Sequence, residues 1–416
     1  MRFNYNALPV LIALAVLVAV FAAISRQRVK ERVRLWLTAW SLILLHSLVD
    51  FAHFKTHLLA KIELVVGLCA LEMASVVFVV SVAPRARTWR RQLVLTLVLG
   101  IPPVVYTSAM LWDVHAKGLY YVLIVLWLTA VLALLSIWYK RMTLYVDLMA
   151  LASIGVAALL AGLVAYGKEE YGMHAILAAL NFSAAALYWY RMQRASAGVL
   201  ATVFGFVAWG LTLPSGIVMA TIIPSIRVEA EVWNIPKYLV AVGMIVTLLE
   251  NQILESDHLA YHDALTGLPN RRLLQDRLVQ ALARADRDTH KVAVLLLDLD
   301  DFKEVNDNFG HRIGDAALQQ VVAKLSSRMR SSDTLARSGG DEFTIVSEVT
   351  SAEGAQTLAL ALESALLAPL QVEDAVVRTG VSVGYALYPD DASTPDDLCA
   401  AADRAMYAAK RGIGSL

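Results

Sequence analysis

Nine long apolar stretches in the first 250 residues constrain the fold of this chain more than any other feature. Most of them approach the roughly 20 residues that a helix needs to cross a bilayer. The first lacks a basic segment beyond Arg2 and a clear cleavage site, so we interpret it as a retained span rather than a signal peptide. We expect a multi-span α-helical membrane bundle with about nine spans, near residues 7–25, 35–54, 62–83, 92–112, 119–138, 144–166, 174–190, 198–223 and 236–250.

The composition divides the chain into two modules. Hydrophobic residues make up 58% of its 416 residues, above the roughly 45–50% of an average soluble domain, which argues against a purely soluble protein. The net charge of zero conceals two halves, because residues 1–250 hold 20 basic and 11 acidic residues, whereas residues 251–416 hold 16 and 25. Such asymmetry favours two modules. One cysteine lies in each half, Cys69 and Cys399, so no disulfide framework is predicted.

Basic residues predict how the spans are oriented. Thirteen Lys and Arg residues fall in four alternate loops, at 26–34, 85–91, 140–141 and 191–194. Loops rich in Lys and Arg stay in the cytoplasm, which places the N-terminus outside and, after nine crossings, residue 251 inside. We therefore expect a multi-pass protein of the inner membrane, in contact with lipid, whose C-terminal half is cytoplasmic.

One predicted span carries an unusual polar stripe. His46, Asp50, His53 and His57 follow one another at intervals of four, three and four, so on a continuous helix they would share one face. Ionisable groups at membrane depth are costly and often functional, so a haem, metal or proton-sensing site is one interpretation. The interpretation that we favour is that Asp50 pairs with a neighbouring helix, while His53 and His57 lie at the outer interface.

The shorter apolar runs after residue 250 indicate a soluble α/β domain. The last span continues without a Pro- or Gly-rich linker, so residues 251–262 are expected to connect the modules as one helix. Helical spacing, apolar runs and alternation predict helices over 271–285, over 316–329 and from Thr394, and strands over 292–297, around 335, over 343–346 and, half-buried, over 377–387. Because helices alternate with strands, we expect an α/β sandwich around one mixed sheet.

Acidic residues gather at two predicted turns: Asp298, Asp300 and Asp301 follow an apolar strand, and Asp341 and Glu342 follow two glycines. Mg²⁺ prefers oxygen ligands and in nucleotide sites takes one or two carboxylates together with substrate phosphates. The pattern fits a magnesium ion and a nucleoside triphosphate, although a purely structural acidic cluster has the same pattern. No GxxxxGK[ST] loop is present, so phosphates would be bound by other means.

Three strings in a fixed order sharpen this interpretation. Residues 263–271 read DALTGLPNR, residues 298–307 read DLDDFKEVND, and residues 339–343 read GGDEF. Together they resemble the GGDEF family of diguanylate cyclases over about residues 258–412. The resemblance implies a polymerase-palm-like α/β domain that converts two GTP into cyclic di-GMP and two pyrophosphates. It also implies a homodimer, since each domain would hold one GTP.

The resemblance further implies roles for individual residues. Asp298, Asp341 and the carbonyl of Leu299 would bind Mg²⁺ or Mn²⁺, and Asp341 or Glu342 would help to deprotonate the attacking 3′-hydroxyl. Two glycines would let the backbone approach the nucleotide, Gly339 and Gly340. The remaining substrate positions are Asn306 and Asp315 for guanine, His311 nearby, and Phe302, Lys303 and Lys410 along the phosphates.

Two further features concern regulation and phosphate binding. Arg330 and Asp333 have the spacing of the family's RxxD product-inhibition site, where an Arg fork would grip phosphate or guanine. The alternative is an arginine at a helix end that pairs with Asp333. The family usually ends in AKxxGRN, whereas this chain keeps Lys410 and lacks the later arginine, with Arg411 as the candidate substitute.

We therefore predict an integral membrane domain over 1–250, a connecting helix over 251–262 and a GGDEF diguanylate cyclase domain over 263–416. The expected function is a membrane-bound diguanylate cyclase regulated by the membrane domain and by product inhibition. A non-catalytic cyclic di-GMP receptor that signals through the membrane domain is the alternative, and a transporter with a regulatory nucleotide domain ranks last. Expected partners are GTP, cyclic di-GMP, a second copy of the chain and membrane lipid, but not nucleic acid.

Overall fold

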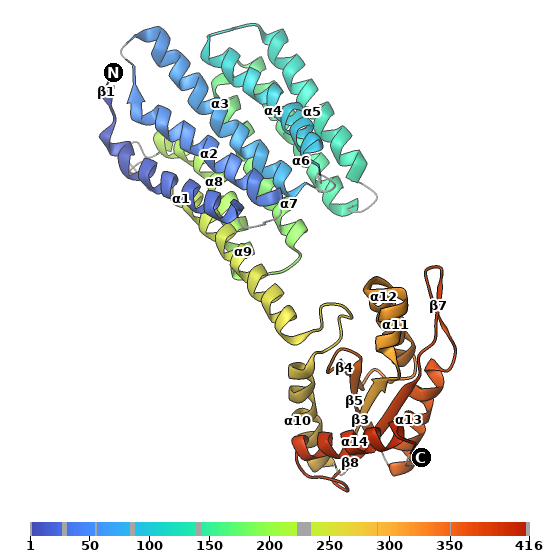
Figure 1. Ribbon diagram of the computed structural model, residues 1–416. Coiled ribbons are helices and arrows are strands. Elements are labelled where there is room, and N and C mark those ends of the chain that lie inside the picture. Colours follow the sequence, from blue (N-terminus) through green and yellow to red (C-terminus); the bar gives the residue numbers. More distant parts are fainter. Residues whose placement is uncertain are drawn as a thin grey trace. The chain divides into compact units, whose positions relative to one another are not determined.

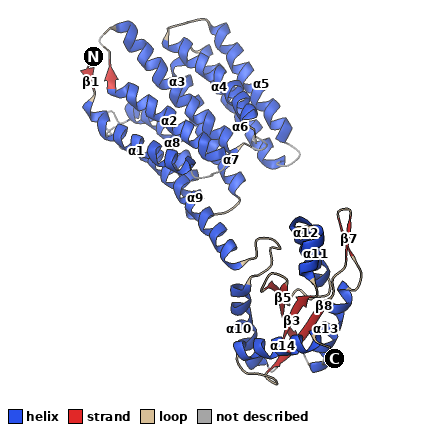
Figure 2. Cartoon of the chain, viewed as in Figure 1, coloured by secondary structure: helices blue, strands red, loops and turns tan. Residues whose placement is uncertain are grey.

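The chain forms two compact units, Met1–Glu250 and Asn251–Leu416. The computed structural model describes residues 2–26, 31–54, 56–83, 88–138, 143–222, 234–288, 290–349 and 351–412. Helices dominate the first unit, and the longer strands belong to the second (Figure 2). One helix, α9 (Ile235–Tyr261), contains residues of both units, so no break in secondary structure marks the boundary.

Each apolar range predicted as a span contains a helix (Figure 1). By length and composition, seven helices in the described residues could cross a membrane, namely α1 to α6 and α9. The other two predicted spans are helical as well. The nine long helices in the described part of the first unit are α1 (Leu8–Arg26), α2 (Glu31–Phe51), α3 (His57–Val82), α4 (Trp89–Leu111), α5 (Lys117–Trp138), α6 (Thr143–Ala165), α7 (Gly172–Met192), α8 (Ala197–Ile222) and α9.

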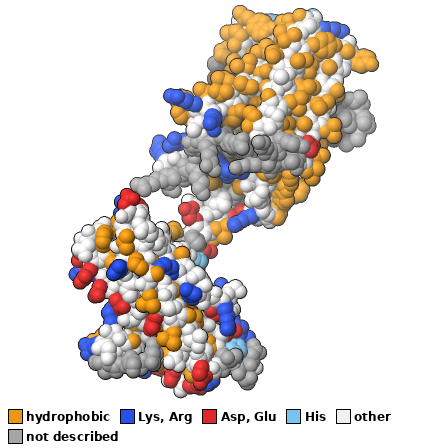
Figure 3. All heavy atoms as spheres, turned by 90° about the vertical axis from the view of Figure 1, so that its right-hand side faces the viewer, with side chains coloured by type: hydrophobic (Ala, Val, Ile, Leu, Met, Phe, Trp, Pro, Cys, Tyr) orange, Lys and Arg blue, Asp and Glu red, His pale blue; other side chains and the backbone are white. Residues whose placement is uncertain are grey.

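The first unit has an aromatic core and an apolar exterior. Trp36 and Trp40 of α2 are fully buried, and the Trp36 indole nitrogen donates to the Ser81 hydroxyl at 3.0 Å. A buried carboxyl, Glu72 of α3, accepts a hydrogen bond from Thr107 of α4 at 2.5 Å. Hydrophobic side chains cover much of the face of this unit seen in Figure 3. An apolar surface of this extent is typical of a membrane or partner contact.

Small residues bring α8 and α9 together. A Cβ added to Gly243 of α9 would lie 2.5 Å from the backbone nitrogen of Thr202 on α8, and one added to Gly205 would lie 2.8 Å from the backbone nitrogen of Val240. The Thr202 hydroxyl is satisfied within its own helix, since it donates to the Gly198 carbonyl at 2.8 Å. Close backbone approach at small residues is a common way for membrane helices to associate.

The polar stripe predicted on one helical face is divided in the structure. α2 ends at Phe51, and Ala52–His53 form a short strand, β2, that pairs with β1 (Arg2–Phe3). α3 begins only at His57, so the prediction of one shared face is wrong. Pairing with the N-terminal strand ends the helix, which residue spacing does not reveal. The His53 side chain lies outside the described residues, and among those described no three His, Cys, Asp or Glu side chains are placed to hold a metal ion.

A four-stranded antiparallel sheet forms the centre of the second unit. Its strand order is β4 (Thr334–Arg337), β5 (Glu342–Val349), β3 (Lys291–Leu299) and β8 (Val381–Tyr388). In the central strand, Val294 lies opposite Val346 of β5 and Ala386 of β8. A separate hairpin is formed by β6 (Leu370–Val372) and β7 (Ala375–Val377). The sheet is therefore not the mixed one that we predicted.

The order of the strands explains this error. The helices after β3 lead to β4, and these two strands do run parallel, but the β4–β5 hairpin places β5 between them. β5 and β8 are parallel in the same way and are separated by β3. The predicted strand over 377–387 is also interrupted between Val377 and Val381. β8 is buried on both faces rather than half-buried, because α14 covers Gly384 and Ala386.

Helices cover both faces of the sheet. One apolar cluster joins one face to α11 (Phe302–Phe309), α12 (His311–Ser326) and α13 (Ala352–Leu366). A second cluster joins the other face to α10 (Arg271–Asp288) and α14 (Pro395–Lys410). α12 begins earlier than predicted, and α14 begins where predicted, with the Thr394 hydroxyl accepting the Asp397 amide hydrogen at 3.2 Å. Ser-or-Thr capping followed by proline is a typical helix start.

Candidate active site

The register of β3 and β5 brings the two acidic turns together. Asp298 near the end of β3 lies directly opposite Glu342 at the start of β5. Beyond this pair, the Leu299 amide donates to the Asp341 carbonyl at 3.2 Å. Asp298 and Asp341 are both partly exposed and Glu342 is exposed, so a ligand can reach them. The structure thus joins sequence segments about 40 residues apart into one acidic site.

A lysine from α14 completes this acidic site. The Lys410 ammonium donates to a carboxylate oxygen of Asp298. This hydrogen bond raises the pKa of Lys410; burial opposes the rise, and the attraction of Asp298, Asp300 and Asp341 adds to it. Lys410 was predicted to line the phosphates of a substrate, and the structure places its charge among the acidic groups that would bind the metal.

The donor atoms at this site match a hard divalent cation. Asp298 and Asp341 supply carboxylates, and the Leu299 carbonyl belongs to the same strand end. In the described residues no third His, Cys, Asp or Glu converges with them closely enough to form an all-protein cage. Mg²⁺ is commonly bound in this way, through one or two carboxylates, with substrate phosphates and water filling the octahedron.

Asp300 has a different role from its neighbour two residues earlier. Its carboxylate accepts the Ser382 hydroxyl at 2.7 Å, and its amide donates to the Gly380 carbonyl at 3.1 Å. Its carbonyl accepts the Thr379 hydroxyl at 3.0 Å. These contacts fix the end of β3 against the start of β8, so Asp300 positions the segment that carries Asp298.

An arginine that sequence reasoning missed holds the Gly-Gly turn. Arg337 donates twice to the Gly340 carbonyl, at 3.1 and 2.6 Å, and once to the Asp263 carboxylate at 3.0 Å. Asp263 also accepts from the amide and hydroxyl of Thr266, at 2.8 and 2.6 Å. Partial burial opposes ionisation of Asp263, but the hydrogen bonds from Thr266 and Arg337 outweigh it and lower its pKa. The string at 263–271 thus helps to shape the turn.

The two glycines of that turn have different surroundings. A Cβ at Gly339 would lie 2.6 Å from a carboxylate oxygen of Glu342, so a side chain there would displace this acid. A Cβ at Gly340 would meet no atom within 4 Å, so its outer side is open. Gly339 therefore serves the packing of the turn, and the open side of Gly340 leaves room for a ligand.

The predicted guanine-binding residues meet where α11 and α12 join. Gly310, with a φ of 79°, turns the chain between the helices, and a Cβ at Gly314 would collide with the Asn306 amide. Asn306 therefore lies against the backbone at Gly314, the residue that precedes Asp315. His311, one turn before Asp315, is exposed.

The two predicted phosphate-binding residues of α11 differ in exposure. Lys303 is exposed, whereas Phe302 is only 4% exposed and belongs to the core. Phe302 therefore offers a phosphate no exposed side chain.

Comparison with known proteins agrees with this geometry. Residues 260–414 match the family described as diguanylate cyclase, GGDEF domain. They form a GGDEF domain. Over 168 residues the chain is 45% identical to the bifunctional diguanylate cyclase/cyclic di-GMP phosphodiesterase MucR of Pseudomonas aeruginosa, covering 40% of this chain and 24% of MucR. Over 157 residues it is 43% identical to the diguanylate cyclase TpbB of the same species, covering 37% of this chain and 36% of TpbB.

The similarity to these relatives is limited to part of each protein. The chain spans about a quarter of MucR and about a third of TpbB. It is also similar to the crystal structure of the TpbB GGDEF domain, with 40% identity, a TM-score of 0.35, and coverage of 35% of this chain and 92% of that one.

The RxxD segment of the GGDEF domain forms a tight turn before β4. The Asp333 carboxylate accepts the Arg330 amide hydrogen at 2.8 Å and, through its other oxygen, the Ser347 hydroxyl at 2.8 Å. The Arg330 side chain is exposed and forms no ion pair with any described residue. Asp333 is therefore fixed to β5, while the Arg330 guanidinium is available to a ligand.

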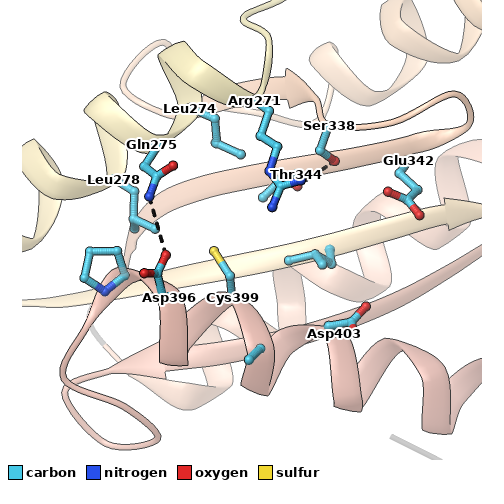
Figure 4. Close-up of a pocket in the computed structure, with 13 residues that line it drawn as sticks. Arg271, Leu274, Gln275, Leu278, Ser338, Glu342, Thr344, Asp396, Cys399 and Asp403 are labelled. Carbon is cyan, nitrogen blue, oxygen red and sulfur yellow. Dashed lines mark hydrogen bonds between the residues drawn. The ribbon is translucent and has the colours of Figure 1, made fainter.

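A cleft of about 430 Å³ opens between α10 and α14 of the GGDEF domain (Figure 4). Glu342 lies at its edge, and Arg271 and Ser338 also line it. One polar contact joins its two helices, since Gln275 of α10 donates to Asp396 of α14 at 3.4 Å, and Ser338 and Thr344 share a hydrogen bond of 3.0 Å within the β4–β5 hairpin. The cleft gives access to Glu342 from the α10–α14 face of the sheet.

The C-terminal end of the GGDEF domain is described as far as residue 412. The Arg411 guanidinium lies 4.3 Å from the centre of the Tyr407 ring, where it stacks on α14. The segment that replaces the family's GRN ending, residues 413–416, lies outside the described residues.

Proposed function

We propose that this protein is a membrane-bound diguanylate cyclase that condenses two GTP into cyclic di-GMP and two pyrophosphates. The observation that carries the proposal is the convergence of Asp298, Asp341 and Lys410 beside Glu342 at one end of the sheet. Membership of residues 260–414 in the GGDEF family and the names of the relatives MucR and TpbB support it.

In this proposal the GGDEF domain binds Mg²⁺ or Mn²⁺ through Asp298, Asp341 and the Leu299 carbonyl. When bound, the ion would make the 3′-hydroxyl more acidic and neutralise phosphate charge. Glu342, exposed beside this group, accepts the proton of the attacking hydroxyl. Lys410 supplies the fixed positive charge that phosphates need.

Guanine would be recognised where α11 and α12 join. The Asp315 carboxylate can only accept hydrogen bonds and suits the N–H groups of guanine, whereas the Asn306 amide can both donate and accept. His311 and Lys303, both exposed, border the same region. A single domain offers one such pair, so two GTP molecules meet only when two copies of the chain face each other. We therefore propose a homodimer as the active form.

The first unit would anchor this enzyme in the inner membrane and regulate it. The seven apolar helices found among the described residues support membrane insertion, and the distribution of basic residues supports a cytoplasmic GGDEF domain. The orientation was predicted from thirteen Lys and Arg residues. Six of them lie outside the described residues: Arg28, Lys30, Arg85, Arg87, Lys140 and Arg141. A fluorescent protein that folds only in the cytoplasm, fused after residue 416, should fluoresce. A dark but membrane-inserted fusion would contradict the orientation.

The decisive experiment is GTP turnover by the purified full-length protein. We expect cyclic di-GMP, detected by mass spectrometry, when Mg²⁺ and GTP are present and none when Mg²⁺ is chelated. A protein that binds cyclic di-GMP but never forms it would contradict catalysis and favour the receptor alternative. That alternative has one observation in its favour, the exposed Arg330 side chain beside the fixed Asp333 carboxylate. In an active enzyme, we propose that the same pair serves product inhibition.

A further inference from the structure

The helices α8 and α9 contact each other in a fixed antiparallel register. A Cβ added to Gly198, near the start of α8, would overlap the amide nitrogen of Thr247. One added to Gly205, two turns later, would lie 2.8 Å from the amide nitrogen of Val240. Later positions on α8 thus meet earlier positions on α9. Backbones that fit this closely resist sliding, because a shift along the axis would drive a side chain against the opposite backbone.

Polar contacts hold both ends of this helix pair. At one end, the Lys237 ammonium of α9 lies 5.8 Å from the centre of the Trp209 ring of α8, within the range of a cation–π attraction. At the other end, the Glu250 carboxylate of α9 accepts the Ser196 hydroxyl at 2.5 Å and the Gly198 amide hydrogen at 3.2 Å. The close backbone contacts lie between these two ends, so α9 is held to α8 along its whole path through the first unit.

The Glu250 carboxylate serves as a cap for α8, although it belongs to another helix. The first amide groups of an α-helix have no acceptor within the helix, and the positive end of the helix dipole favours an anion. Ser196 precedes α8, and its hydroxyl oxygen accepts the Val199 amide hydrogen at 3.4 Å. Glu250 takes the Gly198 amide hydrogen, and its other oxygen accepts the Ser196 hydroxyl. One carboxylate therefore ties the two helices together.

Glu250 is also the last residue of α9 that belongs to the first unit. The helix continues as far as Tyr261, within the second unit. Glu250 is partly buried, whereas each residue from 251 to 257 is exposed. The contact of Glu250 with the start of α8 thus determines where α9 leaves the packing of the first unit.

We propose that Glu250 is a positioning residue for the cyclase, which holds the connecting helix, and through it the GGDEF domain, in a restricted set of orientations. This inference rests on the proposed function, in which two domains that each hold one GTP must face each other. A domain on a fixed helix has fewer orientations to sample before it meets the second domain. Such restriction raises the rate of a reaction between two bound groups.

Amide hydrogen exchange of the full-length protein, in nanodiscs of phosphatidylglycerol and phosphatidylethanolamine, tests the contact itself. Glu250→Ala should raise exchange over residues 197–200 about 10-fold or more, because it removes the acceptor of a charge-assisted hydrogen bond. Glu250→Gln keeps an acceptor oxygen and should restore most of the protection. Glu255→Ala, which removes an exposed carboxylate from the same helix, is the matched control and should leave this exchange unchanged.

Turnover tests the consequence of the contact. It is measured as cyclic di-GMP formed per GTP-binding site, and the sites are counted with a non-hydrolysable GTP analogue so that unfolded protein does not contribute. In Glu250→Ala we expect kcat to fall about 3-fold or more, since orientation is lost, while KM for GTP stays unchanged. Glu250→Gln should recover most of kcat, and Glu255→Ala should keep it.

Several results would overturn the proposal. Unchanged exchange over 197–200 in a folded Glu250→Ala variant would show that the contact is not made. Raised exchange with an unchanged or higher kcat would show that the contact does not position the domain. If Glu250→Ala does not fold, Ser196→Ala removes the hydroxyl that donates to Glu250, and an unchanged kcat in that variant would reject the role. A wild-type protein that forms no cyclic di-GMP would overturn the proposed function as well, whereas failure of the positioning role alone leaves wild-type turnover intact.

Discussion

The two units of this protein place their ionisable groups by different physical means. In the GGDEF domain, strand register brings Asp298 opposite Glu342 and next to Asp341, so backbone hydrogen bonds fix the relation between the acids. In the first unit, Glu250 of α9 meets Ser196 because the packing of α8 against α9 brings them together. In a sheet, the hydrogen bonds between strands determine how the side chains of a site lie relative to one another. In a helix bundle, their relative positions depend only on which helices lie side by side. Substitutions in each unit can test this difference.

The largest effect is expected for Asp341→Ala. Removing this carboxylate removes a proposed metal ligand. Even substitution of residues that only support the ligands of a metal site commonly lowers metal affinity or activity 10–100-fold. We expect the rate of cyclic di-GMP formation, measured by mass spectrometry, to fall by at least about 100-fold. Asp374→Ala, at an exposed turn between β6 and β7, is the matched control and should keep full activity. Retained turnover in a folded Asp341→Ala variant would mean that register has not placed this acid at the metal.

The acidic site could be predicted from the sequence, but its supports could not. The strings at 298–307 and 339–343 identify both halves of the site, and their approach follows from strand pairing. The contact between Arg337 and Asp263 joins positions 74 residues apart and leaves no periodic signal. The mixed sheet was predicted because helices alternate with strands, and the β4–β5 hairpin overrides that rule.

The helices of the first unit could be predicted from the sequence because long apolar runs are a strong signal. The residues that share one face of a helix could not be predicted in the same way. The stripe from His46 to His57 assumed a continuous helix, and the pairing of β1 with β2 ends α2 at Phe51. The partner of a polar residue in a bundle depends on which helix lies beside it. The contact of Glu250 with the start of α8 could therefore be found only in the structure.

Arg337→Ala tests whether the Gly-Gly turn depends on side chains as well as on register. It removes hydrogen bonds to Asp263 and Gly340, and such charge-assisted bonds are typically worth about 1.5–3 kcal/mol. We expect the free energy of unfolding of the GGDEF unit, measured in urea at pH 7, to fall by that amount. Arg284→Ala breaks an exposed pair with Glu348 and should cost less than about 1 kcal/mol.

This prediction has a pH signature. Because the folded state lowers the pKa of Asp263, its contribution is fully present above its unfolded value of about 3.9 and is lost as the pH falls through the lower folded value. The difference in stability between wild type and Arg337→Ala should therefore be the same at pH 7 and pH 5 and should shrink only below about pH 4, to the part contributed by the hydrogen bonds to the Gly340 carbonyl, which does not titrate. A difference that disappears between pH 7 and pH 5 would assign the effect to another group.

Gly243→Ala tests packing as the specifying force in the first unit. Its Cβ would lie 2.5 Å from backbone and hydroxyl atoms of Thr202, so α8 and α9 must separate. Overpacking of this kind typically costs about 1–3 kcal/mol, which should lower the midpoint of thermal unfolding in nanodiscs. Gly155→Ala in α6 is the matched control, since its Cβ would meet nothing within 4 Å and alanine is the better helix former. Equal melting of both variants would show that the α8–α9 contact is not close.

The smallest effect is expected for Arg330→Ala. The charge of this side chain lies in an exposed turn, outside the strands of the sheet and the helices of the first unit. The Arg330 backbone is fixed by Asp333, but its side chain is exposed, so its removal should leave folding and initial turnover unchanged. If the guanidinium grips cyclic di-GMP, the inhibition constant for the product should rise about 10-fold or more, which corresponds to about 1.4 kcal/mol. Arg328→Ala removes another exposed arginine two residues earlier, and it is the matched control that should leave inhibition unchanged. Should both variants weaken inhibition equally, the general charge of this surface would be responsible, and the turn at Asp333 would be structural. A selective effect at Arg330 would instead show that a turn anchored to β5 can position a regulatory side chain as reliably as the register positions the acids.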